Sequence, residues 1–329
     1  MTGTVDWESQ IGRRLRLRDL HIFFAVVRSG SMAKAAAHLR VTQPSVSKAI
    51  SDLEAALGVR LFDRSPRGVE PTRYGDALIK CGSAVFDELR QGIRNIEYLA
   101  DPTVGELRFG CASSILSTAL ATVIEKFSQQ YPRVRLHVDD IPAHSSSQLT
   151  TGVRDRKYDF TVGRLDWPFT LEEDDLDAEV LFYDRLVLAV GKNSRWVRRR
   201  KIDLAELVDE RWVLTPPGTP NYVGLAEALA ARGLKMPTAN LVTLSAPLRA
   251  HLLANAQCVT VFTSSALRAN ADRYELKVLP VDLLDRSYPI VIVRLRNRTL
   301  SPVAERFIEC AREVAKSFAR SKSRNDEQG

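Results

Sequence analysis

The sequence predicts a multidomain α+β protein in which a small helical domain, one long helix and a two-lobed α/β domain follow one another. Short amphipathic helical segments fill the first part of the chain, up to about residue 57. A helical pattern without proline then runs over residues 73–99, and strands alternate with helices beyond Gly105. A chain of 329 residues is also too long for one ordinary core.

The charge of the chain favours a polyanionic partner. The formal net charge is +7, and residues 1–73 hold twelve Lys and Arg against seven Asp and Glu, so most of the excess lies in the first quarter. A basic domain of this kind suits nucleic acid. The hydrophobic share of 45% and the charged share of 26% are those of a globular protein and exclude a disordered chain.

The sequence lacks the motifs that are typical of several other classes of protein. The cysteines, Cys81, Cys111, Cys258 and Cys310, lie far apart without zinc or dithiol spacing, so we expect them reduced and buried, with no metal and no cofactor. No G-x-S-x-G, H-E-x-x-H or phosphate-loop motif occurs, so we expect no catalytic residues and no enzyme. The start lacks a signal-peptide pattern and no long apolar run occurs, which predicts a cytoplasmic protein without membrane contact.

Three short helices are predicted at the N-terminus. The first begins at Leu17 and ends at Ser29-Gly30, and Ser31 caps a second that contains a run of alanines. Thr42 is placed to cap the third, with Pro44 in its first turn. Its inward positions step by three and four residues and are Val46, Ile50, Leu53 and Leu57. Its outward positions are Gln43, Ser45, Ser47, Lys48 and Ser51.

The outward face of the third helix carries small hydroxyls and an amide, which can approach phosphates and base edges in a major groove. Residues 59–62 then form a predicted strand, and residues 63–71 combine turn formers with Arg64 and Arg67, as a β-hairpin over a phosphate backbone would. Three helices followed by a wing define a winged helix-turn-helix, whose partner is double-stranded DNA.

Residues 17–75 resemble the N-terminal domain of LysR-type transcriptional regulators nearly throughout. The family patterns A-A-x-x-L, (S/T)-Q-P-x-(V/L)-S and L-E-x-x-L-G-x-x-L-F-x-R stand in register. The resemblance implies a helix-turn-helix over residues 32–51 and a wing arginine at Arg64. It also implies DNA contacts by recognition-helix residues, here Gln43, Pro44, Ser47 and Lys48. The family commonly has Arg at the position of Lys48, and Lys does not form the bidentate fork with guanine.

The full predicted set of DNA-contacting residues combines the two lines of reasoning. Whether each side chain meets a base, a phosphate or water stays open at this point. The set is Ala33, Thr42, Gln43, Pro44, Ser45, Ser47, Lys48, Ser51, Arg64, Arg67 and Arg73.

The long helix carries an apolar stripe that a small domain cannot bury by itself. The same helix of a second chain is the simplest partner, which predicts a homodimer or homotetramer, and the alternative is packing on the chain's own C-terminal domain. The resemblance implies the first, because this element is the dimerising linker helix of LysR-type proteins. A proline and a glycine in residues 101–105 then form a hinge. The stripe is Leu78, Val85, Leu89, Ile93, Ile96 and Ala100.

The C-terminal part is predicted to be a two-lobed α/β domain. Strands are expected at 106–111, 134–139, 159–162, 186–190, 212–215, 258–262 and 290–293, with a helix over 116–130. The chain should cross between lobes near 177–181 and return near 276–281. Residues 132–140, 151–165 and 301–315 resemble the LysR-type effector domain, which implies a periplasmic-binding-protein-like fold.

Loops after the strands should converge on one cleft for a small-molecule effector. Ser113 and Ser114 are expected at a helix N-terminus, which suits an anion, although one of them can serve only as a cap. A small organic acid or a sugar is the expected ligand. The predicted effector-binding residues are Ser113, Ser114, His144, Ser145, Gly163, Arg164, Thr215, Thr219 and Thr263.

The predicted function is effector-dependent, sequence-specific DNA binding that regulates transcription, with RNA polymerase as a further candidate partner. The alternative is a periplasmic-type solute-binding protein, which would need a signal peptide and no helix-turn-helix. The expected parts are a DNA-binding domain (15–72), a linker helix and hinge (73–105), an effector domain (106–320) and a tail (321–329). Lobe I takes about 106–178 and 280–320, and lobe II about 179–279.

Overall fold

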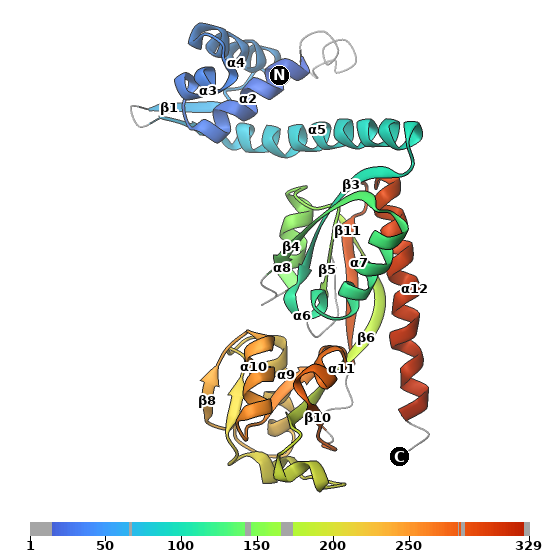
Figure 1. Cartoon of the computed structure of the whole chain (residues 1–329). Helices are drawn as coiled ribbons and strands as arrows, with labels where there is room; N and C mark the ends of the chain where they lie inside the picture. The colour runs from blue at the N-terminus through green and yellow to red at the C-terminus, as the bar shows by residue number, and fades with distance from the viewer. Residues whose placement is uncertain are drawn as a thin grey trace. The chain divides into compact units, whose positions relative to one another are not determined.

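A computed structural model describes residues 15–65, 68–141, 146–165, 174–281, 283 and 287–325. The chain forms two compact units, Met1–Arg90 and Gln91–Gly329, and the boundary between them falls within one long helix (Figure 1). No helix of these described residues is both long and apolar enough to span a membrane.

The first unit is a three-helix core with a two-stranded wing. Its helices are α2 (Leu17–Ser29), α3 (Met32–Leu39) and α4 (Gln43–Leu57). Phe23, Ala35, Val46 and Ile50 lie among its buried side chains. Ser31 caps α3 as predicted, since its side chain accepts a bond from the amide of Lys34.

The wing consists of β1 (Phe62–Ser65) and β2 (Gly68–Pro71), which pair antiparallel. The strand predicted from residue 59 is wrong for its first three residues. The amide of Leu61 donates to Glu54 Oε1 at 2.8 Å, so this amide is committed to a side chain of α4 instead of a strand partner. Gly68 has φ +139°, and a Cβ there would lie 2.7 Å from Gly30 O, so only glycine fits this close approach.

The helix α5 (Arg73–Ala100) is continuous over 28 residues. Thr72 caps it, because its Oγ1 accepts from the amides of Tyr74 and Gly75 at 3.2 Å. The first half packs on α2, where Phe86 contacts Phe24 edge to face at 5.7 Å between ring centroids. The second half belongs to the other unit.

Lobe I of the second unit is built on one part of a mixed sheet. The strands β3 (Val104–Ala112), β4 (Arg133–Ile141) and β5 (Phe160–Arg164) run parallel, and β11 (Ser287–Leu295) pairs antiparallel with β5. Four helices complete the lobe: α6 (Ser113–Leu116), α7 (Ala119–Gln130), α8 (Ser146–Arg154) and α12 (Pro302–Asn325).

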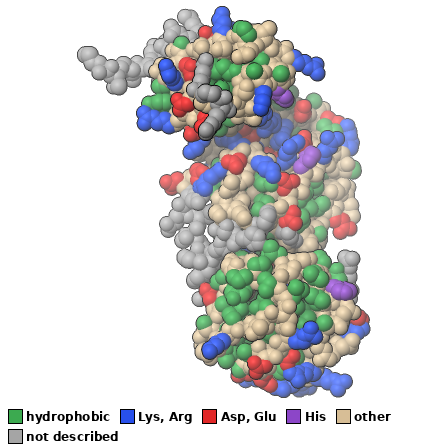
Figure 2. Space-filling view, turned by 90° about the vertical axis from the view of Figure 1, so that its left-hand side faces the viewer, with side chains coloured by type: hydrophobic (Ala, Val, Ile, Leu, Met, Phe, Trp, Pro, Cys, Tyr) green, Lys and Arg blue, Asp and Glu red, His purple; other side chains and the backbone are tan. Residues whose placement is uncertain are grey.

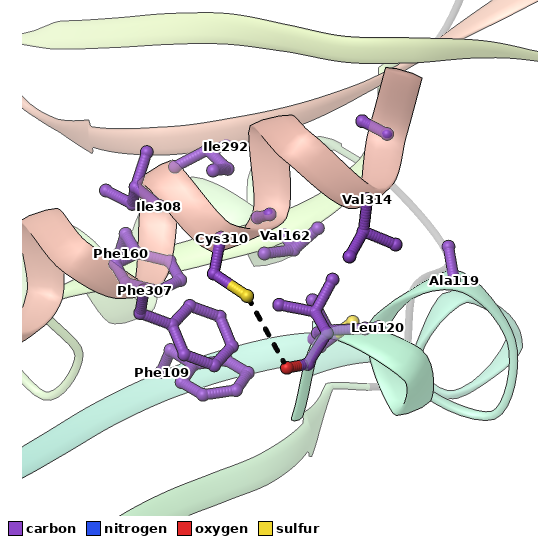
Figure 3. Packing of buried hydrophobic residues seen from close by; sticks show 14 of the residues in the cluster. Phe109, Ala119, Leu120, Phe160, Val162, Ile292, Phe307, Ile308, Cys310 and Val314 are labelled. Atoms are coloured by element: carbon purple, nitrogen blue, oxygen red, sulfur yellow. Dashed lines mark hydrogen bonds between the residues drawn. The ribbon is translucent and has the colours of Figure 1, made fainter. Parts of the chain in front are cut away.

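The lobe I core lies where α7 and α12 cover this sheet. Figure 3 shows Phe307 of α12 beside Phe109 and Phe160 of the strands. The rings of Phe109 and Phe160 are stacked with centroids 5.2 Å apart, and Phe307 packs on Phe109 at 4.9 Å. Burial of four large aromatic side chains, with Phe127 as the fourth, makes α12 an integral part of the lobe.

Lobe II is built on the second half of β6 (Leu176–Gly191), which pairs with β9 (Thr260–Thr263) and β10 (Leu276–Val278). A second, parallel pair is β7 (Trp212–Leu214) with β8 (Ala239–Val242). The helices are α9 (Pro220–Ala230), α10 (Ala246–Asn255) and α11 (Ser264–Tyr274), with 3-10 turns η1 (Arg195–Arg198) and η2 (Leu204–Leu207).

Several predicted boundaries differ from the structure. The helix expected over 116–130 is broken, since α6 ends at Leu116 and α7 begins at Ala119. The crossing out of lobe I lies later than 177–181, because β6 pairs with β11 as far as Arg185 and with β9 from Leu186. The return crossing lies between β10 and β11, after the expected 276–281. The tail expected from residue 321 begins later, as α12 reaches Asn325.

The cysteines follow their prediction in part. Cys111, Cys258 and Cys310 are buried, and burial raises the pKa of each of these thiols. Cys81 on α5 is exposed, against the prediction, because its side of the helix faces away from the core of the first unit.

Candidate functional site

The helix α4 presents the predicted outward face to solvent. Val46, Ile50 and Leu53 are fully buried on its opposite side, which fixes the rotation of the helix. Leu57 is only half-buried, and Ala49 takes a buried place that the prediction did not name. The exposed residues are Gln43, Pro44, Ser45, Lys48 and Ser51, and Ser47 is half-buried.

The start of α4 differs from the prediction in one detail. Thr42 stands at the N-cap position with extended backbone, but its side chain makes no capping bond to the backbone. Its hydroxyl lies 2.8 Å from that of Ser45, and both residues are exposed. The hydroxyls of Thr42 and Ser45 therefore form one polar surface at the start of α4, which suits a phosphate.

The other predicted DNA-contacting residues lie on neighbouring elements of the same unit. Ala33 is exposed near the start of α3. Arg64 lies on β1 opposite Val69, and Arg67 falls outside the described residues. Arg73 is exposed at the start of α5, where its guanidinium donates to Tyr74 Oη at 2.6 Å.

On the lobe I side of the expected cleft, the two serines do not begin a long helix. Ser113 and Ser114 lie in α6, which has four residues, and α7 starts separately after Thr118. The full dipole of a long helix therefore does not point at them, because the dipole needs a continuous run of peptide units. Ser114 is exposed, and its carbonyl accepts from Thr118 Oγ1 at 3.0 Å.

Gly163 and Arg164 are the last two residues of β5, whereas the predicted strand ended at residue 162 and left both in the following loop. Gly163 is buried and packs on Leu149, whose methyl carbons would lie 2.3 Å from an added Cβ, so a larger residue there would have to displace this leucine. The guanidinium of Arg164 stacks on the ring of Tyr288 at 4.7 Å. His144 and Ser145 fall outside the described residues.

On the lobe II side, the structure brings two predicted residues together. Thr215 follows β7 and Thr219 precedes α9, and both are buried. Thr219 Oγ1 lies 2.6 Å from Thr215 Oγ1 and 2.7 Å from Pro216 O. These bonds close residues 215–219 into a compact loop at the carboxyl end of β7.

Thr263 lies at the crossing between lobes. Its Oγ1 accepts from the amide of Ala266 at 3.3 Å and so helps to cap α11. The buried carboxylate of Asp184 on β6 accepts from Ser264 Oγ at 2.6 Å and from the amide of Ser265 at 3.1 Å. An internal carboxylate thus occupies the N-terminus of α11, which leaves no place for a ligand anion there.

Two polar residues that meet at Val261 O were not predicted from the sequence. Arg249 of α10 is buried, and its Nη1 donates to Val261 O at 2.7 Å. Asn221 Nδ2 donates to the same oxygen at 3.5 Å. The available signal was a single arginine within the apolar stretch 248–254, which periodicity places on the inward face of a helix.

A buried polar cluster joins the second half of α5 to lobe I. Asp159 Oδ1 accepts from Gln91 Nε2 at 3.1 Å, from Arg94 Nη1 at 3.3 Å and from Arg298 Nη2 at 3.0 Å. Its other oxygen accepts from the amide of Arg108 at 3.0 Å. Asp159 directly precedes β5, so the linker helix is bonded to the strand that ends at the expected cleft.

Comparisons with known proteins match both units. Residues 17–76 match the family model for the bacterial regulatory helix-turn-helix protein of the lysR family, and residues 100–316 match the model for the LysR substrate binding domain. The chain belongs to the LysR family of transcriptional regulators. It is therefore a DNA-binding transcriptional regulator with an effector-binding domain, and regulators of this family form oligomers.

Relatives that match three quarters or more of the chain are also named as transcriptional regulators. The HTH-type transcriptional regulator TdcA of Escherichia coli (strain K12) is 31% identical over 250 residues, which cover 75% of this chain and 76% of TdcA. The HTH-type transcriptional regulator YdcI of the same organism is 27% identical over 304 residues, covering 92% of this chain and 97% of YdcI.

Solved LysR-type structures share the fold. A full-length OxyR variant from Pseudomonas aeruginosa aligns with a TM-score of 0.62 at 19% identity, covering 92% of this chain and 95% of OxyR. Full-length CbnR in complex with its target DNA aligns with a TM-score of 0.59 at 20% identity, and the alignment covers 91% of this chain and 100% of CbnR. Together with the family models, these structures confirm the winged helix-turn-helix and the two-lobed effector fold.

Proposed function

We propose that this LysR-type regulator reads its DNA site through the outward face of α4 and through its wing. The observation that carries the proposal is the arrangement of α4, where Gln43, Ser45, Lys48 and Ser51 are exposed opposite a fully buried row. An amide can pair with two edge atoms of adenine, whereas the ammonium of Lys48 suits a phosphate. Gln43 is therefore the base-reading residue, and Lys48 holds the backbone.

The wing and the start of α5 supply further backbone contacts in this proposal. Arg64 lies on β1 and Arg73 begins α5 two positions after the end of β2, so both belong to the segment that follows the recognition helix. Arginines at these places neutralise phosphates, which makes binding strongly dependent on salt. Ala33, Thr42, Pro44, Ser47 and Arg67 complete the proposed interface.

The effector site is proposed to lie between the lobes, at the carboxyl ends of their parallel strands. The two helices α6 and α11, which follow β3 and β9, lie side by side across the two lobes (Figure 1). The residues placed in the site are Ser113, Ser114, Gly163, Arg164, Thr215, Thr219 and Thr263, with His144 and Ser145 as candidates outside the described part. The ligand is a small organic acid or a sugar.

Effector binding is proposed to shift lobe closure and thereby the spacing of two DNA half-sites within a dimer or tetramer. The exposed apolar row of α5 supports the dimer contact, since Leu89, Ile93, Ile96 and Leu99 are between 43% and 81% exposed. Hydrophobic side chains also gather on the face of lobe II in Figure 2. The exposed large hydrophobic side chains of this lobe include Leu241, Val242, Leu244 and Leu248. A second apolar surface of this kind supports assembly beyond a dimer.

Three further parts of the proposal concern setting and partners. A regulator of this family acts on the bacterial chromosome, so its place is the cytoplasm. RNA polymerase is a candidate partner, because regulators bound beside a promoter can contact it. No catalytic role is assigned to the chain. The domain division is 15–72, 73–105 and 106–320.

The test of this proposal is Gln43→Ala, with Gln129→Ala on α7 as an exposed control of the same residue type in the other unit. Loss of a bidentate base contact should weaken binding to the specific site by about 1–3 kcal/mol and leave binding to random DNA nearly unchanged. Fluorescence anisotropy with both DNAs measures the two affinities. Equal losses on both DNAs would place Gln43 on the backbone and contradict base reading by this residue.

A further inference from the structure

The buried arginine of lobe II has no partner of opposite charge among the described residues. The side chain of Arg249 is 4% exposed, and no described carboxylate lies within ion-pair distance of it. Its Nη1 donates to Val261 O at 2.7 Å, and the guanidinium stacks on the ring of Phe262 at 4.6 Å. Its Nε has no hydrogen-bond partner.

The guanidinium bonds to β9 at the level where the parallel strands β7 and β8 end. The amide of Val213 donates to Val259 O at 3.0 Å, so β7 runs beside β9 at this level. After Leu214 the chain turns into the loop 215–219, and Val261 O receives Arg249 and Asn221 instead of a further strand amide. β8 ends at the same edge, since the amide that follows Val242 donates to Leu214 O at 2.9 Å.

A buried charge without a counter-ion costs stability. Burial lowers the pKa of Arg249 to about 10, because a low-dielectric surrounding disfavours the charged form. The carbonyl oxygen of Val261 needs only a neutral donor, and Asn221 already provides one. Bonding to carbonyls also does not require burial, since Arg232 of the same lobe donates to the carbonyls of Ala228 and Leu283 while it remains exposed. The charge at Arg249 is thus in excess of what the fold needs.

We propose that Arg249 binds the acidic group of the effector, so that the ligand is a small carboxylate or an anion of similar size and not a neutral sugar. The Nε edge of the guanidinium, which has no partner at Nε, can accept a carboxylate side-on in two parallel bonds. Thr215, Thr219 and Asn221 stand around the same strand ends and offer polar groups for the rest of the ligand. This assignment rests on the proposed effector site and names its ligand class.

Binding also requires a movement in this account. Because Arg249 is 4% exposed, an acid reaches it only when neighbouring residues move. Asn221, which shares Val261 O with Arg249, lies in the first turn of α9 just after the loop 215–219, so a shift of this loop would open the way to the guanidinium. Entry of the ligand would break the bond between the two threonine hydroxyls, which links the acid to the position of α9.

The experiment uses the full-length protein and its variant Arg249→Met, with Arg232→Met as the control. Thermal unfolding is followed alone and with four probes: gluconate against glucose, benzoate against benzamide, succinate against succinamide, and inorganic phosphate. We expect at least one acid to raise the wild-type Tm by several degrees, about 5 °C near saturation, while its neutral counterpart does not. Arg249→Met should lose this shift, and its Tm without ligand should equal or exceed that of wild type, since an uncompensated buried charge is gone.

Three results would overturn the assignment: an acid that stabilises Arg249→Met as much as wild type, neutral probes that match their acids, or no acid with any effect on wild type. A fall in ligand-free Tm of Arg249→Met larger than that of Arg232→Met would show a structural role instead. DNA binding by the wild type is measured in parallel. If the wild type binds DNA sequence-specifically and any of these results is found, only the acid site is refuted and the proposed function stands. If the wild type binds specific and random DNA equally well, the proposed function itself is refuted.

Discussion

The exposed apolar row of α5 gives a quantitative test of dimer formation. Ile93 is 57% exposed and Ile96 is 68% exposed, and both lie on the predicted stripe. We consider the double variant Ile93→Ser with Ile96→Ser. It changes side chains that are mostly solvated in one chain, so the fold of a single chain should lose little stability.

The expected loss of association follows from this exposure. Full burial of one isoleucine contributes about 2 kcal/mol, so covering the exposed parts contributes about 1.1 and about 1.4 kcal/mol. A two-fold interface counts each side chain twice, which gives about 5 kcal/mol for the pair of helices. At about 1.4 kcal/mol per decade, the dissociation constant should rise by more than three orders of magnitude.

Sedimentation velocity over a range of protein concentrations measures this constant. Val278→Ser on β10 is the control, because Val278 is 55% exposed and belongs to lobe II instead of α5. The control should dissociate like the wild type, and the double variant should be monomeric at micromolar concentration. If the double variant keeps the wild-type dissociation constant, α5 does not form the dimer contact and its row packs elsewhere.

Two more predictions concern stability. Asp159→Asn should lower the Tm by about 10 °C, because it leaves the buried guanidinium of Arg298 without its carboxylate at a cost of about 3–5 kcal/mol. The control is Asp155→Asn, since Asp155 is exposed. An equal fall of the Tm in both variants would contradict a buried ion pair. The hydrogen bond from Arg312 lowers the pKa of Glu179, so the stability from this carboxylate is present above its ordinary pKa of about 4.3 and is lost as pH falls through the lowered value. In Glu179→Gln, the free energy of unfolding measured in urea should therefore fall less between pH 5 and pH 3 than in the wild type. An unchanged dependence on pH would show that the pair of Glu179 and Arg312 does not contribute to stability.

Sequence periodicity was sufficient for the DNA-binding unit. The inward row of α4 repeats every three to four residues, and its key members Val46, Ile50 and Leu53 are all fully buried. The wing was predicted from its turn residues, but its first strand was placed three residues too early. That difference depends on Glu54, a tertiary contact that no local pattern reveals.

The effector domain could be predicted only in outline. The break between α6 and α7 has no glycine or proline, so a continuous helix was the reasonable expectation for residues 116–130. The length of β6 was also missed, because it pairs with one lobe and then with the other and its pattern of burial changes midway. Arg249 was passed over because an arginine in an apolar helix is identified as buried and unpaired only when the strand ends around it are known.

The central claim is that the exposed face of α4 reads DNA sequence, and selection of bound sequences from a random DNA library tests it most directly. The full-length wild type should enrich a two-fold symmetric motif whose half-sites lie about one or more helical turns apart, and Gln43→Ala should enrich a degenerate form of it. A wild type that enriches no motif, or a Gln43→Ala library identical to that of the wild type, would contradict the claim.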